Sequence, residues 1–118
     1  LDESLAYQLY MAERTGTLWE TDGPEASCNH GFASHGGVHL LYRDVLGLQE
    51  VDVVNKNVQL RFTDSRLDWC EGRLPTVDGP VELRWRKDAG KLVYQVTAPA
   101  GYSIKTENRS GLEAVRQP

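Results

Sequence analysis

The chain has 118 residues, about one domain's worth, and its 13 basic and 17 acidic residues give a formal charge of −4. No stretch approaches the roughly 18 consecutive apolar residues of a membrane-spanning helix. The net negative charge argues against electrostatic binding to nucleic acid or anionic lipid. Two cysteines are too few for a disulfide scaffold, and no Cys/His cluster has the spacing of a zinc site. The chain starts at Leu1 without Met, so we expect a piece of a longer protein.

The first 48 residues show helical spacing of apolar side chains. A first helix is predicted over 2–14, with Gly16 as a left-handed stop, and a second over 35–46, with Ser34 as its N-cap and Gly47 at its end. Two helices of about a dozen residues cannot enclose a core, because short helices depend on tertiary packing. We therefore expect the helical part, residues 1–48, to be the edge of a larger helical domain.

The segment between these helices, residues 16–33, is rich in Gly, Asn, Pro and Asp and shows no period. Loops of this length in compact domains usually have a functional reason. This one presents carboxylates, an imidazole, an amide and an indole. From residue chemistry alone, a loop glutamate such as Glu20 is most often only solvated, and His30 is more often a hydrogen-bonding residue than a ligand. No nucleophile elbow, phosphate-binding glycine loop or zincin helix is present, so no cofactor or metal is expected.

After residue 48 the period changes to alternation, which predicts strands. Val58, Leu60 and Phe62 alternate with polar residues, and two alternating runs over 81–86 and 92–98 flank a short Asp- and Gly-containing link. Such a pair predicts a β-hairpin. A further strand is predicted over 102–106, whereas the tail from residue 108 shows no period and is expected to fray. Residues 49–118 are thus predicted to form an antiparallel β-sandwich or sheet domain, and the whole chain an α+β fragment.

Three segments resemble the C-terminal part of bacterial α-L-rhamnosidases: residues 17–20 (TLWE), 27–34 (SCNHGFAS) and 41–48 (LYRDVLGL). Strand segments 67–72 and 79–85 are similar to sheet segments of the same family. The resemblance implies about two helices from the end of an (α/α) toroid over 1–48, followed by a C-terminal β domain over 49–118. It also suggests a periplasmic or secreted location.

The resemblance assigns roles to individual loop residues. Glu20 matches the general base of an inverting glycoside hydrolase, and His30 matches a residue that hydrogen-bonds the bound rhamnose. Trp19 either packs beneath the site or lines the sugar pocket, and Asn29 either binds hydroxyls or holds a left-handed turn. The general acid is expected in the missing N-terminal part of the same chain, so the fragment alone is expected to be inactive. The implied substrate is a rhamnose-containing glycan or glycoside.

The β half offers other candidates. Trp69 and Trp85 are predicted to fill the sheet core, with a carbohydrate-stacking platform as the alternative that exposure would distinguish. Cys28 and Cys70 lie in different halves and are expected to be separate buried thiols. The charged residues Glu82, Arg84 and Arg86 fit a solvated strand face. Two other functions stay open: a non-catalytic carbohydrate-binding or structural β module, and a different exo-glycosidase specificity on the same helical fold.

Overall fold

The computed structural model describes residues 2–15 and 37–118, and the chain divides into two compact units, Leu1–Leu40 and Leu41–Pro118. In the first unit, helix α1 spans Asp2–Thr15, one residue longer than predicted at its C-terminal end. Residues 37–40 are also helical. On α1 Met11 is buried, whereas Leu9, one of the apolar residues whose helical spacing predicted this helix, is 63% exposed. In the described part of this unit, the apolar residues at helical spacing on α1 are therefore not buried together.

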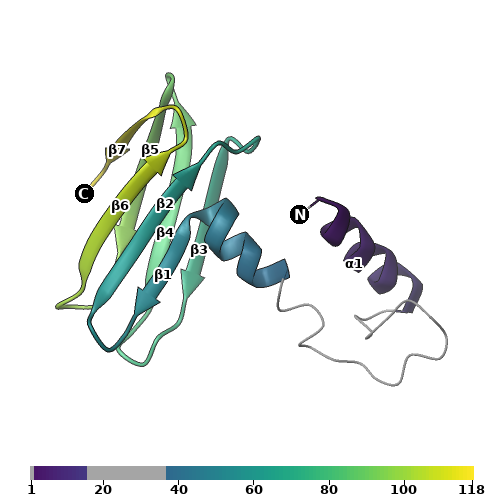
Figure 1. Cartoon of the computed structure of the whole chain (residues 1–118), viewed down its shortest axis with the longest axis horizontal. Helices are drawn as coiled ribbons and strands as arrows, with labels where there is room; N and C mark the ends of the chain where they lie inside the picture. The colour runs from purple at the N-terminus through teal and green to yellow at the C-terminus, as the bar shows by residue number, and fades with distance from the viewer. Residues whose placement is uncertain (1, 16–36) are drawn as a thin grey trace. The chain divides into compact units, whose positions relative to one another are not determined.

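The second unit contains seven strands arranged as two sheets (Figure 1). The first sheet has the order β1-β2-β6, and the second sheet has the order β3-β4-β5-β7. The strands are β1 (Leu48–Asp52), β2 (Asn57–Thr63), β3 (Trp69–Leu74), β4 (Val81–Asp88), β5 (Lys91–Thr97), β6 (Ser103–Arg109) and β7 (Glu113–Arg116). The prediction of a β-rich second half is thus confirmed. The described residues do not test the helical toroid that the resemblance implies for the first half.

Both sheets are mixed, which differs from the purely antiparallel expectation. Strand β2 pairs parallel with β6, and β5 pairs parallel with β7, whereas the remaining pairs are antiparallel. The cause is the path of the chain, because β5, β6 and β7 lie alternately in the second, first and second sheets. A strand that arrives by crossing between sheets has no hairpin turn to force it antiparallel to its neighbour.

Strand β7 corrects the expectation that the tail frays. Its residues pair with β5 in the register Lys91↔Glu113 to Tyr94↔Arg116, and the Gln117 N–H donates to the Tyr94 carbonyl at 2.8 Å. The strand is only four residues long, too short to show a period in the sequence. Backbone hydrogen bonding to a strand already in place orders it.

The predicted hairpin over residues 81–98 is confirmed as β4 and β5. The pair Asp88↔Lys91 closes a two-residue turn, Ala89-Gly90, in which both residues have positive φ, 47° and 78°. These dihedrals match a type I′ turn, whose twist suits the flanking strands. The turn fixes the register that places Val81, Leu83 and Trp85 toward the core.

The core lies between the two sheets. Val58, Leu60 and Phe62 of β2 are at most 2% exposed, as their alternation predicts. The rings of Phe62 and Tyr94 meet across the sheets with centroids 4.9 Å apart, and the Tyr94 hydroxyl lies 3.2 Å from Thr106 Oγ1 on β6. One apolar cluster therefore joins both sheets, which defines a sandwich.

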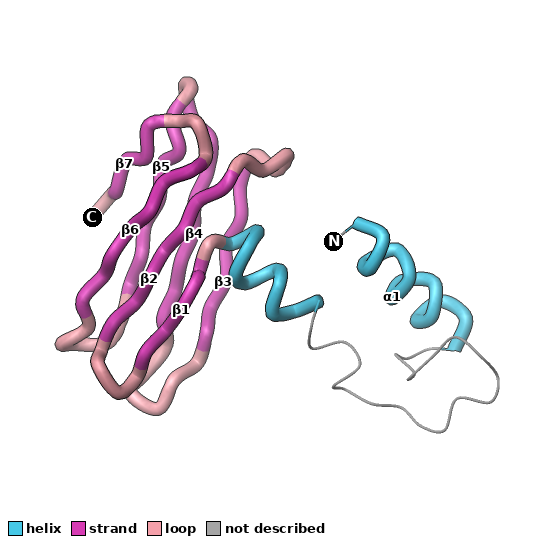
Figure 2. Tube along the Cα trace, in the orientation of Figure 1, coloured by secondary structure: helices cyan, strands magenta, loops and turns pink. Residues whose placement is uncertain are grey.

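The helix predicted to end at Gly47 ends there, but its last turn is a π-helix, η1 (Leu41–Leu46), seen beside the strands in Figure 2. The Trp85 indole N–H donates to the Leu46 carbonyl at 3.0 Å, and the Tyr42 hydroxyl donates to the Arg73 carbonyl at 2.8 Å. A Cβ on Gly72 would lie 2.5 Å from the Leu46 side chain, so a larger residue there would force Leu46 to shift. These contacts make η1 part of the β unit.

Candidate functional site

The residues to which the resemblance assigns chemistry are not among those that the structure describes. Trp19, Glu20, Asn29 and His30 all fall within residues 16–36, as does Cys28. Their roles therefore stay predictions. Polar side chains of the described residues gather, among other places, at an end of the sandwich and on the exposed face of the second sheet.

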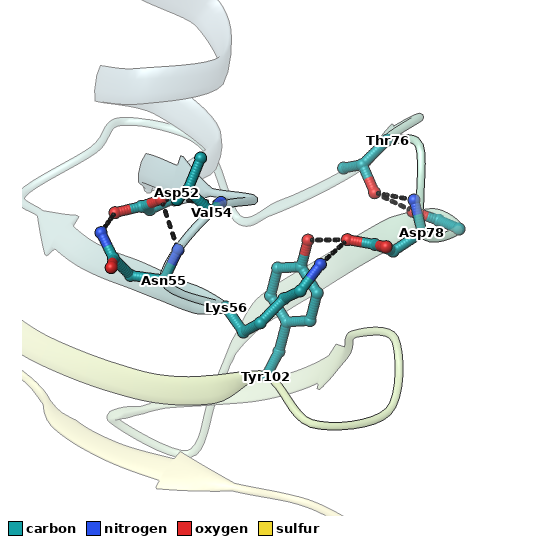
Figure 3. Close-up of polar contacts among 8 residues, drawn as sticks. Asp52, Val54, Asn55, Lys56, Thr76, Asp78 and Tyr102 are labelled. Carbon is teal, nitrogen blue, oxygen red and sulfur yellow. Dashed lines mark hydrogen bonds and ion pairs between the residues drawn. The ribbon is translucent and has the colours of Figure 1, made fainter.

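The first place is the Asp78 cluster, formed by Lys56, Asp78 and Tyr102 (Figure 3). Lys56 lies in the turn between β1 and β2, Asp78 in the loop between β3 and β4, and Tyr102 just before β6. The Tyr102 hydroxyl donates to Asp78 Oδ2 at 2.7 Å, and Lys56 Nζ forms an ion pair with the same oxygen. Lys56 Nζ also lies 5.4 Å from the centroid of the Tyr102 ring.

The loops that carry the Asp78 cluster are themselves fixed by local hydrogen bonds. Asp52 Oδ1 accepts from the backbone N–H groups of Val54 and Asn55, at 2.9 Å each, which sets the turn that leads to Lys56. Thr76 Oγ1 accepts from the Asp78 N–H at 3.2 Å and shapes the other loop. Figure 3 shows both sets of bonds. The cluster thus joins two preformed loops to the connection before β6.

Electrostatics argue against proton transfer by this cluster. Hydrogen bonds from Lys56 and then Tyr102 lower the pKa of Asp78 below its usual value, and the bond to Asp78 raises the pKa of Lys56. Burial, followed by the bond to Asp78, raises the pKa of Tyr102. None of the three groups changes its charge near neutral pH, where a general acid or base must be poised. We interpret the Asp78 cluster as a clamp that holds loops together.

The second place is the outer face of the second sheet, the side directed away from the core. Alternation along β3 puts Trp69 on this face together with Glu71 and Arg73. Trp69 is 63% exposed, whereas Trp85 is 4% exposed. The prediction that both indoles fill the core is confirmed for Trp85 and wrong for Trp69. The polar residues at the two following alternate positions were the sequence signal for this orientation.

The charged residues of β4 lie on the outer face, as predicted: Glu82, Arg84 and Arg86 are all exposed. Arg73 pairs with Glu82 at 3.3 Å, and Arg86 pairs with Asp88 at 3.4 Å. These exposed ion pairs add little stability. They matter for the site because these four charged side chains pair among themselves and not with the other charged side chains of the outer face.

Two open hollows meet on the outer face. One of about 540 Å³ extends toward Arg73 and Glu82, and one of about 280 Å³ extends toward Trp69. Both are lined by the same three side chains, one from each of three adjacent strands: Glu71, Arg84 and Gln95. The register pairs Glu71 with Arg84 and Arg84 with Gln95, so the three form a row across the sheet.

Residues 2–15 and 37–118 give little support to a metal site, a membrane-spanning helix or a reactive cysteine. No group of three or more His, Cys, Asp or Glu side chains in this part could hold a metal ion. No helix in the same part is both long and apolar enough to cross a membrane. Cys70 is a free thiol that is partly buried rather than fully buried, and burial raises its pKa, which disfavours a reactive thiolate.

Comparison with known proteins gives one match. Residues 47–106, just over half of the chain, match the family described as bacterial alpha-L-rhamnosidase C-terminal domain. The matched range runs from the residue after η1 into β6 and so includes the Asp78 cluster and most of the outer face. No curated protein and no solved structure matches the chain.

Proposed function

The chain belongs to the bacterial alpha-L-rhamnosidase C-terminal domain family, and from this premise we propose that it is the C-terminal region of an enzyme that hydrolyses terminal α-L-rhamnosyl residues with inversion. The match over residues 47–106 is the observation that carries the proposal. It supports a glycoside hydrolase as the whole protein and a rhamnoside as its substrate. The loop chemistry below deepens the proposal and rests on the resemblance of residues 17–34.

Glu20 acts as the general base in this proposal. Inversion at the anomeric carbon needs one carboxylate that takes a proton from water on one face of the sugar and one carboxylic acid that protonates the leaving oxygen on the other. The two carboxyl groups stand roughly 6.5–9.5 Å apart in such enzymes, with the sugar and the water between them. Asp22 and Glu25 are too close to Glu20 in sequence for the opposite face, so we assign the acid to the preceding part of the enzyme.

The neighbouring loop residues bind the sugar in this proposal. His30 hydrogen-bonds a rhamnose hydroxyl, and Asn29 either shares that task or holds the turn in which His30 sits. Trp19 either stacks on the sugar or supports Glu20 from below. Within the β unit, η1 is fixed to the sandwich through Leu46 and Tyr42.

The test compares the intact enzyme with the 118-residue chain on an aryl α-L-rhamnoside. We expect the intact enzyme to release the aryl alcohol and the purified chain to release none, since the chain supplies only one of the two required carboxyl groups. Turnover by the purified chain, with its rate proportional to protein concentration, would contradict this division of the catalytic pair. Cleavage of a different aryl glycoside by the intact enzyme, with none of the rhamnoside, would contradict the proposed substrate.

A further inference from the structure

Trp69 is the largest apolar side chain that the β unit leaves exposed, and the backbone that carries it is held in place. The Lys87 N–H donates to the Asp68 carbonyl at 2.7 Å, and Lys87 Nζ bonds to the Ser65 carbonyl, so the approach to β3 is tied to β4. The cross-strand neighbour of Trp69 is Arg86, which forms its ion pair with Asp88. An indole ring has only two side-chain dihedral angles, so it loses little conformational freedom when a ligand stacks on it.

The row beside Trp69 offers hydrogen bonds that the described protein does not use. Among residues 2–15 and 37–118, neither Glu71 nor Arg84 has a side-chain hydrogen bond or ion-pair partner, although they face each other across β3 and β4. The Gln95 amide N–H donates to the Pro118 carbonyl at 2.6 Å, which orients the amide and leaves its oxygen to accept. The row thus combines a carboxylate acceptor, guanidinium donors and an amide.

The charges on the outer face select the class of ligand. Glu71 and Arg84 carry opposite charges in one row, and the flanking charges form the pairs Arg73–Glu82 and Arg86–Asp88. No excess of either sign remains to attract an anion or a cation. A neutral ligand rich in hydroxyl groups, with one apolar ring face, matches an indole beside mixed donors and acceptors. The hollow that Trp69 lines, about 280 Å³, lies just below the lower limit of roughly 300 Å³ for small-molecule sites, which suits one sugar unit better than a larger ligand.

We propose that the outer face of the second sheet binds a pyranose unit of a glycan, which stacks on Trp69 and hydrogen-bonds to Glu71, Arg84 and Gln95. None of these residues is among those assigned to hydrolysis, and the site holds sugar without cleaving it. Its role is to keep the polysaccharide or oligosaccharide near the enzyme and so raise the local concentration of substrate.

The experiment is an NMR titration of the ¹⁵N-labelled 118-residue chain with a rhamnose-containing oligosaccharide. Among the indole N–H signals of the three tryptophans, that of Trp69 is identified by its loss in Trp69→Phe, and that of Trp85, bonded to Leu46, serves as an internal control. We expect the Trp69 indole and Gln95 amide signals to shift with a dissociation constant on the order of millimolar, and the Trp85 signal to stay in place.

Substitutions at the site and at a control position test whether binding depends on the named side chains. Trp69→Ala is expected to weaken binding by about tenfold or more, and Arg84→Ala to weaken it by a smaller factor. Val77→Ala is the matched control, because Val77 is a 91% exposed apolar residue away from the outer face, and binding should be unchanged. An unchanged thermal unfolding curve for Trp69→Ala shows that the loss is local.

Two results would overturn the proposal: no shift of the Trp69 signal up to the solubility limit of the sugar, or equal affinity in the Trp69→Ala variant. The measurement records binding by the chain alone, which is independent of any turnover by the intact enzyme. Failure here would therefore leave the hydrolytic proposal standing, and failure of hydrolysis would leave this site standing.

Discussion

Replacing Glu20 with Gln in the intact enzyme is expected to lower the turnover of an aryl α-L-rhamnoside by at least about 10²–10⁴-fold, the contribution typical of a positioned general base. The amide has nearly the shape of the carboxylate but cannot accept a proton from the attacking water. The Michaelis constant is expected to change little, because the variant removes a base rather than a major contact with the sugar. Steady-state kcat and KM for both proteins provide the measurement.

The pH dependence separates a base from a residue that only supports the fold. A general base must be ionised, so the wild-type rate should fall as pH drops through its pKa, and this acidic limb should disappear in Glu20→Gln. Glu25→Gln, in the same loop, is the matched control and should keep both the rate and the limb. Rates like those of the wild type in Glu20→Gln would remove Glu20 from the proposed role.

The second large effect concerns the β unit. Replacing Trp85 with Ala is expected to reduce the free energy of unfolding by about 3–5 kcal/mol, the range for truncating a buried tryptophan. The side chain is 4% exposed, and its indole N–H is the donor to the Leu46 carbonyl of η1. The change both opens a cavity between the sheets and leaves that carbonyl without its donor. Urea unfolding followed by far-UV circular dichroism gives the loss as a shift of the midpoint.

Trp69 provides the comparison within the same strand pair. Trp69→Ala removes the same number of atoms from a 63% exposed position, so its effect on the unfolding free energy should stay within about 0.5 kcal/mol. Trp85→Phe should fall between the two, because it keeps apolar volume but loses the bond to Leu46. Similar losses for the two alanine variants would contradict the assignment of Trp85 to the core and Trp69 to the surface.

The parts of the fold that local patterns determine were predictable from the sequence. Alternation identified β2 and the hairpin of β4 and β5, because each has one face buried and one exposed. The parallel pairing of β6 with β2 and of β7 with β5 was not predictable from the sequence. It depends on which sheet the chain enters after each crossing. That choice is made by contacts between residues far apart in sequence, which leave no period.

The candidate sites, too, include features that the sequence signals and features that only the folded structure reveals. The exposure of Trp69 contradicts the prediction that it fills the core, although the sequence held a signal for it: Glu71 and Arg73 follow at alternate positions of β3 and so share its face. The Asp78 cluster had no such signal, because Lys56 and Tyr102 lie 22 and 24 residues from Asp78 and only the folded loops bring them together. The roles of Glu20 and His30 came from resemblance to a family, since a loop carboxylate or imidazole by itself specifies no chemistry.

The configuration of the first sugar released by the intact enzyme tests the central claim most directly. Proton NMR of the reaction mixture, recorded from the moment of enzyme addition to an aryl α-L-rhamnoside, resolves the anomeric signals before mutarotation mixes them. The account predicts that β-L-rhamnose appears first and the α anomer accumulates later, because water attacks opposite to the leaving group. Initial release of the α anomer, or of no rhamnose, would contradict it.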